Sequence, residues 1–324
     1  MPRSIVAGCA AFALALGVFA DARAQDTGYP AKPVRVLIGF PPGGLLDTVS
    51  RIVGARMSAL LGQPFIVDAR PGAGGLIATT ALAKSAPDGY TLMMVNDNHA
   101  LNPFILKDVP YDSVKDFAPI GFVGSTPLVF NAYPGLGLKT LKDLVDMAKA
   151  KGGALTYGSV GPGSLPHLST ELFARAAGVK MNHVPYKGGA PALTDLVGGH
   201  INTMMTSLVV SKGHIDAGRL VPLAVAWNQR LEPLPNVPTM AEAGFPLDAA
   251  YWFGLMAPAG TPPAVIGRLE KALATTVAEP EVRNRLADMG TIVTPMNARE
   301  FGDFIQKEMV KWRDAVKAAN VKIE

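Results

Sequence analysis

Residues 36–47, Val-Leu-Ile-Gly-Phe-Pro-Pro-Gly-Gly-Leu-Leu-Asp, pass from an apolar run into a glycine turn and then into a helical pattern. One face of the following segment is apolar at Val49, Val53, Met57 and Leu60. This pattern predicts a strand, a turn and a helix. Adjacent glycines have no Cβ to keep a ligand away from the backbone. The helix behind them offers unpaired N–H groups and the positive end of its dipole. We call this passage from strand through glycine turn to helix, at residues 36–47, the first glycine corner, and predict that it holds an anion as small as a carboxylate.

The first 24 residues are predicted to be a signal peptide for export, which we leave out of the fold. Arg3 provides the positive start, residues 5–20 are apolar, and residues 22–24, Ala-Arg-Ala, form a cleavage site. The apolar run is too short for a transmembrane helix. Cys9, the single cysteine, lies in this segment, so the other 300 residues have no thiol for a disulfide or a metal. We expect a periplasmic protein that is stabilised by its core and is large enough for two domains.

The charge of the chain excludes some partners. The net charge is +4, and it is +3 without the signal peptide. No run of Lys and Arg and no aromatic-basic stripe is present, so nucleic acid is not an expected partner. Nothing after residue 24 is long and apolar enough to lie in a membrane. The weak positive field favours the arrival of anions.

From Pro30 onward, strand and helix patterns alternate, which predicts an α/β fold with mainly parallel sheets and helices on both faces. Residues 30–124 form the first part of lobe 1, residues 125–227 form lobe 2, and residues 228–324 return to lobe 1. We expect a loop at 96–110, a break between strands at 125–127, and a returning strand at 220–227. One lobe interrupted by another through short crossings suits hinge closure over a cleft.

A second glycine turn repeats the first in the other lobe. Residues 158–164, Gly-Ser-Val-Gly-Pro-Gly-Ser, follow a strand pattern and precede a helix for which Ser164 is the expected N-cap. We expect the two corners to converge on one cleft. Each charge-assisted hydrogen bond contributes roughly 1.5–3 kcal/mol, so several of them approach the ~8 kcal/mol of a micromolar complex. His167 has two equally supported interpretations, a donor to a nearby carbonyl or a donor to ligand.

Signals for an enzyme are poor. The sequence has no Gly-x-Ser-x-Gly elbow, no Gly-x-Gly-x-x-Gly or Walker pattern, and no His-x-x-x-His or paired carboxylate cluster. We therefore expect a binding protein without cofactor or metal. Lys187 is interpreted as a solvated turn lysine. The remaining histidines are interpreted as structural: His99, His183, His200 and His214.

Several motifs resemble the Bug proteins, the TctC-like solute receptors of tripartite tricarboxylate transporters. They are Phe-Pro-Pro-Gly-Gly-x-x-Asp at 40–47, Arg-Pro-Gly-Ala-Gly-Gly at 70–75, Pro-Asp-Gly-Tyr-Thr-Leu at 87–92 and Val-Pro-Tyr-Lys-Gly at 184–188. The resemblance covers essentially all of residues 30–324. It implies a two-lobed periplasmic binding protein of the type II, Venus-flytrap kind, in which two glycine loops grip a carboxylate partly through bridging waters.

The resemblance also implies a set of ligand-binding residues. By position they are Phe40, Pro42, Gly43, Gly44, Asp47, Ser159, Gly163, Ser164, His167 and Thr206. Thr206 stands where many members have Asp, which removes a partner for an amino group and favours a plain organic acid. Leu45 and Leu46 replace a residue that often bears a hydroxyl. Together with Phe40 and Trp252 they favour an aromatic or apolar carboxylate, unless they face the core.

The leading hypothesis is therefore a periplasmic receptor that captures a small organic carboxylate, aromatic and dicarboxylate ligands included. It would deliver this ligand as a monomer to the membrane components of a tripartite tricarboxylate transporter. A ligand-sensing receptor of a signalling system, without transport, is the alternative. A hydrolase that uses Ser159 or Ser164 with His167 is the third hypothesis.

Overall fold

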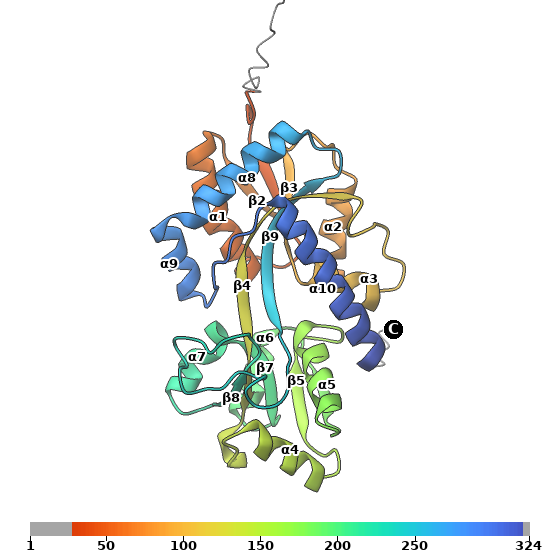
Figure 1. Ribbon diagram of the computed structural model, residues 1–324, viewed down its shortest axis with the longest axis vertical. Coiled ribbons are helices and arrows are strands. Elements are labelled where there is room, and N and C mark those ends of the chain that lie inside the picture. Colours follow the sequence, from red (N-terminus) through yellow and green to blue (C-terminus); the bar gives the residue numbers. More distant parts are fainter. Residues whose placement is uncertain (1–27, 320–324) are drawn as a thin grey trace, which may run out of the picture.

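The computed structural model describes residues 28–319, and the two lobes lie one above the other along the long axis of the molecule (Figure 1). The predicted signal peptide and Cys9 lie outside the described residues. Within residues 28–319, none of the helices combines the length and the hydropathy that crossing a membrane requires.

Lobe 1 is built on a sheet with the strand order β2-β1-β3-β9-β4. Its strands are β1 (Val34–Ile38), β2 (Phe65–Ala69), β3 (Thr91–Asn96), β9 (Ala250–Pro258) and the first part of β4 (Phe117–Ala132). Its helices are α1 (Leu45–Leu61), α2 (Leu76–Ala83) after the short 3-10 helix η1 (Ala73–Gly75), α3 (Asn98–Ile105), α8 (Pro263–Ala278), α9 (Pro280–Asp288) and α10 (Ala298–Ala319).

Lobe 2 continues from the second part of β4, in the strand order β4-β7-β5-β6, and β8 also pairs with β4. Its strands are β5 (Thr156–Ser159), β6 (Asn182–Pro185), β7 (Thr203–Ser207) and β8 (Val221–Val225). Its helices are α4 (Leu141–Ala150), α5 (Leu165–Ala176), α6 (Gly189–Val197), α7 (Leu208–Asp216) and the 3-10 helix η2 (Pro134–Leu136). These elements confirm the α/β class.

The strand β4 connects the two lobes without a break. It pairs with β9 as far as Pro127 and with β7 and β8 from Leu128 onward. The expected break between strands at 125–127 is therefore wrong, although the strand changes partners there, where Pro127 has no N–H to donate. Because β9 and β4 are antiparallel to their neighbours, both sheets are mixed. Parallel pairing is confined to β2-β1-β3 in lobe 1 and to β7-β5-β6 in lobe 2.

The return to lobe 1 occurs later in the chain than expected. Residues 220–227 contain β8, which pairs with β4 inside lobe 2. The following segment also docks there, because Val225 and Pro238 share a backbone hydrogen bond of 2.9 Å and Ala249 donates to Ala226 at 2.9 Å. We therefore propose that lobe 2 extends to residue 249 and that β9, which begins at residue 250, is the returning strand.

The segment 96–110 contains the helix α3 instead of the expected loop. Its polar residues and Pro103 obscured the helical pattern, in which His99 and Leu101 are buried. Pro103 has no N–H to donate to the carbonyl of His99. The Ser113 hydroxyl donates to that carbonyl instead, at 3.0 Å, so the helix tolerates its internal proline.

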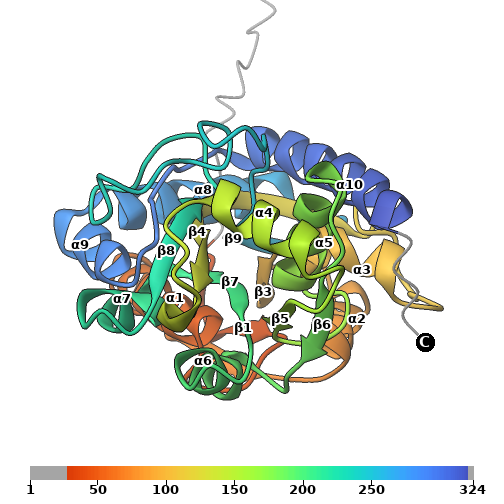
Figure 2. The same ribbon diagram turned by 90° about the horizontal axis from the view of Figure 1, so that it is seen from below.

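The long helix α10 packs against both lobes (Figures 1 and 2). Near its start, Phe301 and Ile305 pack with Trp252 in the core of lobe 1. Near its end, Trp312 and Ala315 join the core of lobe 2. The apolar side chains of α10 are thus core packing, and they tie the two lobes together on one side.

Gly254 of β9 is expected to be essential for stability, because a Cβ at this position would overlap the ring of Phe301. Overpacking of this kind costs about 1–3 kcal/mol, so Gly254→Ala should lower the free energy of unfolding by that amount in urea titrations. Gly267→Ala is the control, since no atom lies within 4 Å of the added methyl group. Because Gly267 lies inside α8, where alanine is favoured by about 1 kcal/mol, this control should be no less stable than wild type. A Gly254→Ala protein as stable as wild type would show that the contact with Phe301 is not tight.

Candidate functional site

The strand directions place the first glycine corner at the edge of lobe 1 that faces lobe 2. β3 is antiparallel to β9, which is antiparallel to β4, so β3 and β4 run in the same direction. β1 and β2 are parallel to β3. Because β4 runs into lobe 2, the carboxyl ends of all three parallel strands point toward that lobe. The turn 39–44, which follows β1, therefore lies on the facing edge.

The second corner lies on the opposing edge of lobe 2. β7 is antiparallel to β4, with Ser207 opposite Leu128 at the crossing, and β5 and β6 are parallel to β7. The carboxyl ends of these strands point toward lobe 1. In the sheet order, β1 lies two strands from β9 and β5 lies two strands from β4. In the strand order, the two corners therefore lie at equal distances on either side of β9 and β4, the strands that run between the lobes.

In the first corner, Asp47 holds the turn closed. The backbone N–H of Gly43 donates to Asp47 Oδ2 at 3.0 Å, and Arg51 Nε donates to the same oxygen at 2.9 Å. Gly43 has φ of 82°, which favours glycine. Gly44 is the N-cap residue of α1, and helix geometry leaves the N–H groups of the first turn without acceptors in the helix.

The charge of Asp47 is balanced within the corner. Its side-chain hydrogen bond with Arg51 is the main reason why the pKa of the Asp47 carboxyl is lowered. The carboxylate is buried while the Arg51 side chain is 57% exposed. An ionised Asp47 would repel an anionic ligand, and the paired guanidinium offsets that repulsion. The helix N-terminus favours the carboxylate as well.

A further glycine turn supports the first corner. The turn 70–75 follows β2, and a Cβ on Gly39 would lie 2.5 Å from Gly75 Cα, so the two turns touch through their backbones. Asn102 of α3 donates to the carbonyl of Gly74 at 3.1 Å. The close contact explains why both turns need glycine.

In the second corner, His167 takes the place of Asp47. The N–H of Gly163 donates to His167 Nδ1 at 2.9 Å, and Gly163 has φ of 71°. The Ser164 hydroxyl donates to the carbonyl of Gly161 at 2.7 Å. Ser164 occupies the expected N-cap position of α5, but its side chain makes no capping hydrogen bond.

A stack of rings supports this corner. His167 and His183 are parallel, with ring centroids 3.9 Å apart, and Tyr157 stacks on His183 at 5.0 Å. Tyr157 donates a hydrogen bond to Glu171. Burial lowers the pKa of His167 to about 4 and, together with the neighbouring His167, that of His183 to about 4. Both rings are therefore neutral at pH 7, as the acceptor role of His167 requires.

The predicted site residues fall into two groups. The exposed Pro42, Gly43 and Gly44 lie on the facing edge of lobe 1, whereas the half-buried side chain of Phe40 packs against the core of that lobe. Thr206 lies at the carboxyl end of β7 and is 5% exposed. By contrast, Asp47, Ser159, Ser164 and His167 make their hydrogen bonds within the corners. Lys187 is exposed on the same edge of lobe 2, after β6.

The geometry does not form the pair that the hydrolase hypothesis requires. The Ser159 hydroxyl lies 2.6 Å from His183 Nε2, not beside His167, and Ser159 is fully buried. His167 Nδ1 accepts from the backbone of Gly163. The role of His183 in this corner was missed, because nothing in the sequence links it to Ser159 before the pairing of β5 and β6 is known.

The side chains that favoured an aromatic or apolar carboxylate belong to the core of the protein. Leu46 is 5% exposed in the core of lobe 1, and Leu45 and Phe40 pack against the same cluster. Trp252 is 1% exposed in a second core cluster. Since these side chains face the core, they give no preference for an aromatic or apolar carboxylate.

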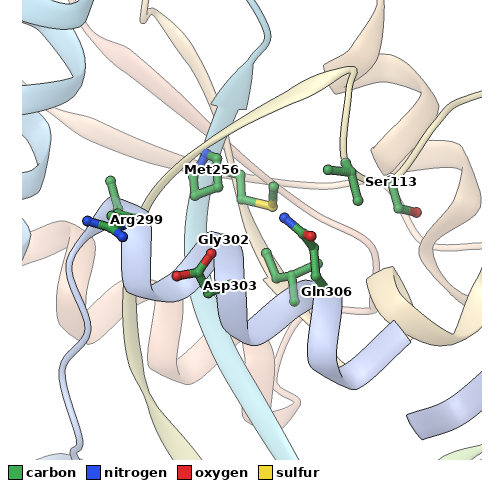
Figure 3. A pocket seen from close by; sticks show the side chains of 10 residues that line it. Ser113, Met256, Arg299, Gly302, Asp303 and Gln306 are labelled. Atoms are coloured by element: carbon green, nitrogen blue, oxygen red, sulfur yellow. The ribbon is translucent and has the colours of Figure 1, made fainter. Parts of the chain in front are cut away.

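Two cavities lie away from both corners. One, of about 280 Å³, lies between α10 and the outer part of β4 and β9 (Figure 3). Its lining includes Ser113, Met256, Arg299, Asp303 and Gln306. The other, of about 470 Å³, lies beside Lys32, Arg35 and Tyr90, at the amino ends of β1 and β3. Among residues 28–319, no group of three or more His, Cys, Asp or Glu side chains is placed to hold a metal ion.

Acid is expected to weaken the second corner. The pKa of His167 is about 4 in the folded protein and about 6.5 in an unfolded chain. Its contribution to stability is complete above pH 6.5 and is lost as the pH falls toward 4. The variant His167→Asn does not titrate, so its stability relative to wild type should rise as the pH falls through this window. Urea unfolding at pH 7.5, 6, 5 and 4.5 measures this difference, and a constant difference would contradict the assignment.

Comparisons with known proteins place the chain among receptors. The family model described as "Tripartite tricarboxylate transporter family receptor" matches residues 49–321. Protein BugT of Bordetella pertussis is 37% identical over 302 residues, which are 91% of this chain and 92% of BugT. An R. palustris protein solved with adipate is 33% identical, with a TM-score of 0.82, and the match covers 91% of this chain and 99% of that one. MatC from Rhodopseudomonas palustris, with bound malate, is 31% identical, with a TM-score of 0.77, and the match covers 89% and 100%.

Proposed function

The chain belongs to the receptor family of tripartite tricarboxylate transporters, and from this premise we propose that it captures a small organic carboxylate between its lobes. The observation that supports the proposal is that the strand directions bring both glycine corners to the edges at which the two lobes face each other. Each corner ends in a helix, and helix geometry leaves N–H groups of the first turn without acceptors in the helix. In α5 these are fewer, because Pro166 has no N–H and the N–H of Ser164 donates to the carbonyl of Gly161 at 3.3 Å. A carboxylate between the corners would be bound from both sides.

The energetics of such a site are sufficient without a buried arginine. Each hydrogen bond from an N–H group to a carboxylate contributes roughly 1.5–3 kcal/mol. Each helix dipole adds about 0.3–1 kcal/mol, and up to ~2 kcal/mol when partly buried. Four such contacts therefore reach the ~8 kcal/mol of a micromolar complex. Closure of the lobes would exclude water and strengthen these contacts further.

The ligand class follows from the charges at the two edges. Asp47 is paired with Arg51, and position 206 carries a threonine, so neither offers a free carboxylate to an ammonium group. This arrangement favours an organic acid without an amino group. Because two relatives were solved with adipate and with malate, dicarboxylates are the first candidates. The exposed Lys187 offers a positive charge at the edge of lobe 2 that faces lobe 1.

We further propose the cellular role that this family implies. The protein would act in the periplasm as a monomer and deliver its ligand to the membrane components of a tripartite tricarboxylate transporter. Closure around the ligand would give those components a shape to recognise. Without the predicted signal peptide the net charge of +3 is mild, which agrees with a partner recognised by shape more than by a strong field.

A thermal-shift screen of the mature protein tests the proposed function. The probes are adipate, malate, and mono-, tri- and aromatic carboxylates, with adipamide as an uncharged control of the same length as adipate. A ligand at 100 times its Kd stabilises the folded protein by about 2.7 kcal/mol, or roughly 4 °C in Tm for a protein of about 300 residues. Hits are then measured by calorimetry. A stabilising effect of adipamide equal to that of adipate, or no effect of any carboxylate, would contradict the proposal.

A further inference from the structure

The two corners share one hydrogen-bonding device although they differ in sequence. In each, a glycine with positive φ donates its N–H to the side chain four residues later. Gly43 donates to Asp47 Oδ2 at 3.0 Å, and Gly163 donates to His167 Nδ1 at 2.9 Å. Both acceptor atoms are two bonds from Cβ, so a carboxylate and a neutral imidazole reach the same place. The residue after each glycine, Gly44 or Ser164, is the extended N-cap of the helix.

Neither acceptor is available to a ligand. The Asp47 side chain is buried and its carboxylate also binds Arg51. His167 is 8% exposed, and one face of its ring is covered by His183. These contacts fix both side chains in the orientation in which they accept from the glycine.

At Gly43 the first turn is restrained by this hydrogen bond. A Cβ on Gly43 would have no atom within 4 Å, so packing does not restrain the turn at this residue. When the glycine N–H is bound internally, the next N–H groups of the helix remain directed along its axis, toward the facing lobe. Without the acceptor, the glycine can rotate and those groups lose their common direction.

We propose that Asp47 and His167 are paired positioning residues, each of which orients the ligand-binding amides of its lobe without touching the ligand. The proposal rests on the proposed function, because it concerns the amides that bind the carboxylate. It predicts that carboxylate affinity depends on the hydrogen-bond acceptor at both positions. The negative charge of Asp47 and the ring of His167 are not required for it.

Matched substitutions separate the acceptor from the rest of the side chain. Asp47→Asn and His167→Asn keep an oxygen at the δ position, whereas Asp47→Leu and His167→Leu have a similar size and no acceptor. Two quantities are measured at pH 7.5: hydrogen exchange of the Gly43 and Gly163 amides by NMR, which needs no ligand, and the Kd for adipate and malate by calorimetry.

The Asn variants should keep the slow exchange of the glycine amide and stay within about threefold of the wild-type Kd. In each Leu variant the glycine amide should exchange at least about tenfold faster, and the Kd should rise at least about tenfold. If Asn and Leu behave alike at either position, or if an Asn variant loses protection, the proposal is wrong. Each corner is tested separately. If one Leu variant does not fold, the proposal is decided by the Leu variant of the other corner and by the two Asn variants. If wild type binds no carboxylate, the proposed function fails, and the exchange rates alone decide the positioning role.

Discussion

Replacing Gly43 or Gly163 by Val is expected to abolish carboxylate binding, with an increase in Kd of at least about a hundredfold, which corresponds to the loss of two charge-assisted hydrogen bonds. Both glycines have positive φ, at 82° and 71°, which a β-branched residue resists. The added side chain also enters the space in front of the corner, where no protein atom lies within 4 Å of a Cβ on Gly43. The strain costs about 1–2 kcal/mol, which is less than the 5–15 kcal/mol typical of folded proteins. Calorimetry with the best ligand of the screen measures the effect.

Gly62→Val is the matched control for this experiment. Gly62 ends α1 with φ of 73° and has equally open surroundings, so the backbone strain is similar. It lies on the order of 25 Å from Gly43, at the other end of a 17-residue helix. Gly62→Val should lose stability but keep wild-type affinity. Equal losses of affinity in Gly62→Val and Gly43→Val would attribute the effect to strain and not to the site.

The second large effect is expected at Asp97, the residue between β3 and α3. Its side chain is 1% exposed, and among residues 28–319 neither carboxylate oxygen has a hydrogen-bond partner. Burial, and secondarily the charge of Glu308, raises the pKa of Asp97 to about 8. The folded protein therefore holds a proton here that the unfolded chain releases near pH 4.

The sign of the pH dependence follows from this difference. Asp97 destabilises the folded protein progressively as the pH rises from about 4 to about 8, by an amount on the order of 5 kcal/mol if the full shift is realised. Asp97→Asn does not titrate, so its stability relative to wild type should increase from pH 5 to pH 8. Urea unfolding at both pH values measures the change, with the exposed Asp303→Asn as control. A relative stability that is the same at both pH values would show that Asp97 is ionised in the folded protein.

The two titrations act in opposite directions between pH 4 and pH 8. Acid removes the contribution of His167 and relieves the cost of Asp97. The wild-type pH profile alone therefore identifies neither group. Differences between a variant and wild type isolate each of them, and both experiments are designed as such differences for this reason.

The two corners were predictable from the sequence because their signals are local. A run of apolar residues, adjacent glycines and a helical pattern within about twelve residues determine a strand, a turn and a helix. The same kind of local signal begins α4, where Thr140 and Asp143 form a capping box. At these positions the backbone preferences and the hydrophobic pattern agree with the tertiary structure.

The parts that were not predicted depend on contacts between distant residues. The continuity of β4 through Pro127 requires β9, which lies more than a hundred residues later. The helix α3 tolerates Pro103 because Ser113 binds the freed carbonyl of His99. His183 joins the second corner only through the pairing of β6 with β5. The resemblance implies that Asp47 and His167 belong to the ligand site, but their hydrogen bonds with Gly43 and Gly163 depend on the folded turns and could not be predicted.

The most direct test of the account is a crystal structure of the protein with the tightest-binding carboxylate of the screen. We expect the oxygens of one carboxylate within hydrogen-bond distance of backbone N–H groups from residues 42–47 of lobe 1 and 161–167 of lobe 2, directly or through one water. Asp47 and His167 should still accept from Gly43 and Gly163. A ligand held by one lobe alone, or bound in the cavity beside α10, would contradict the central claim that opposed glycine corners bind the acid group.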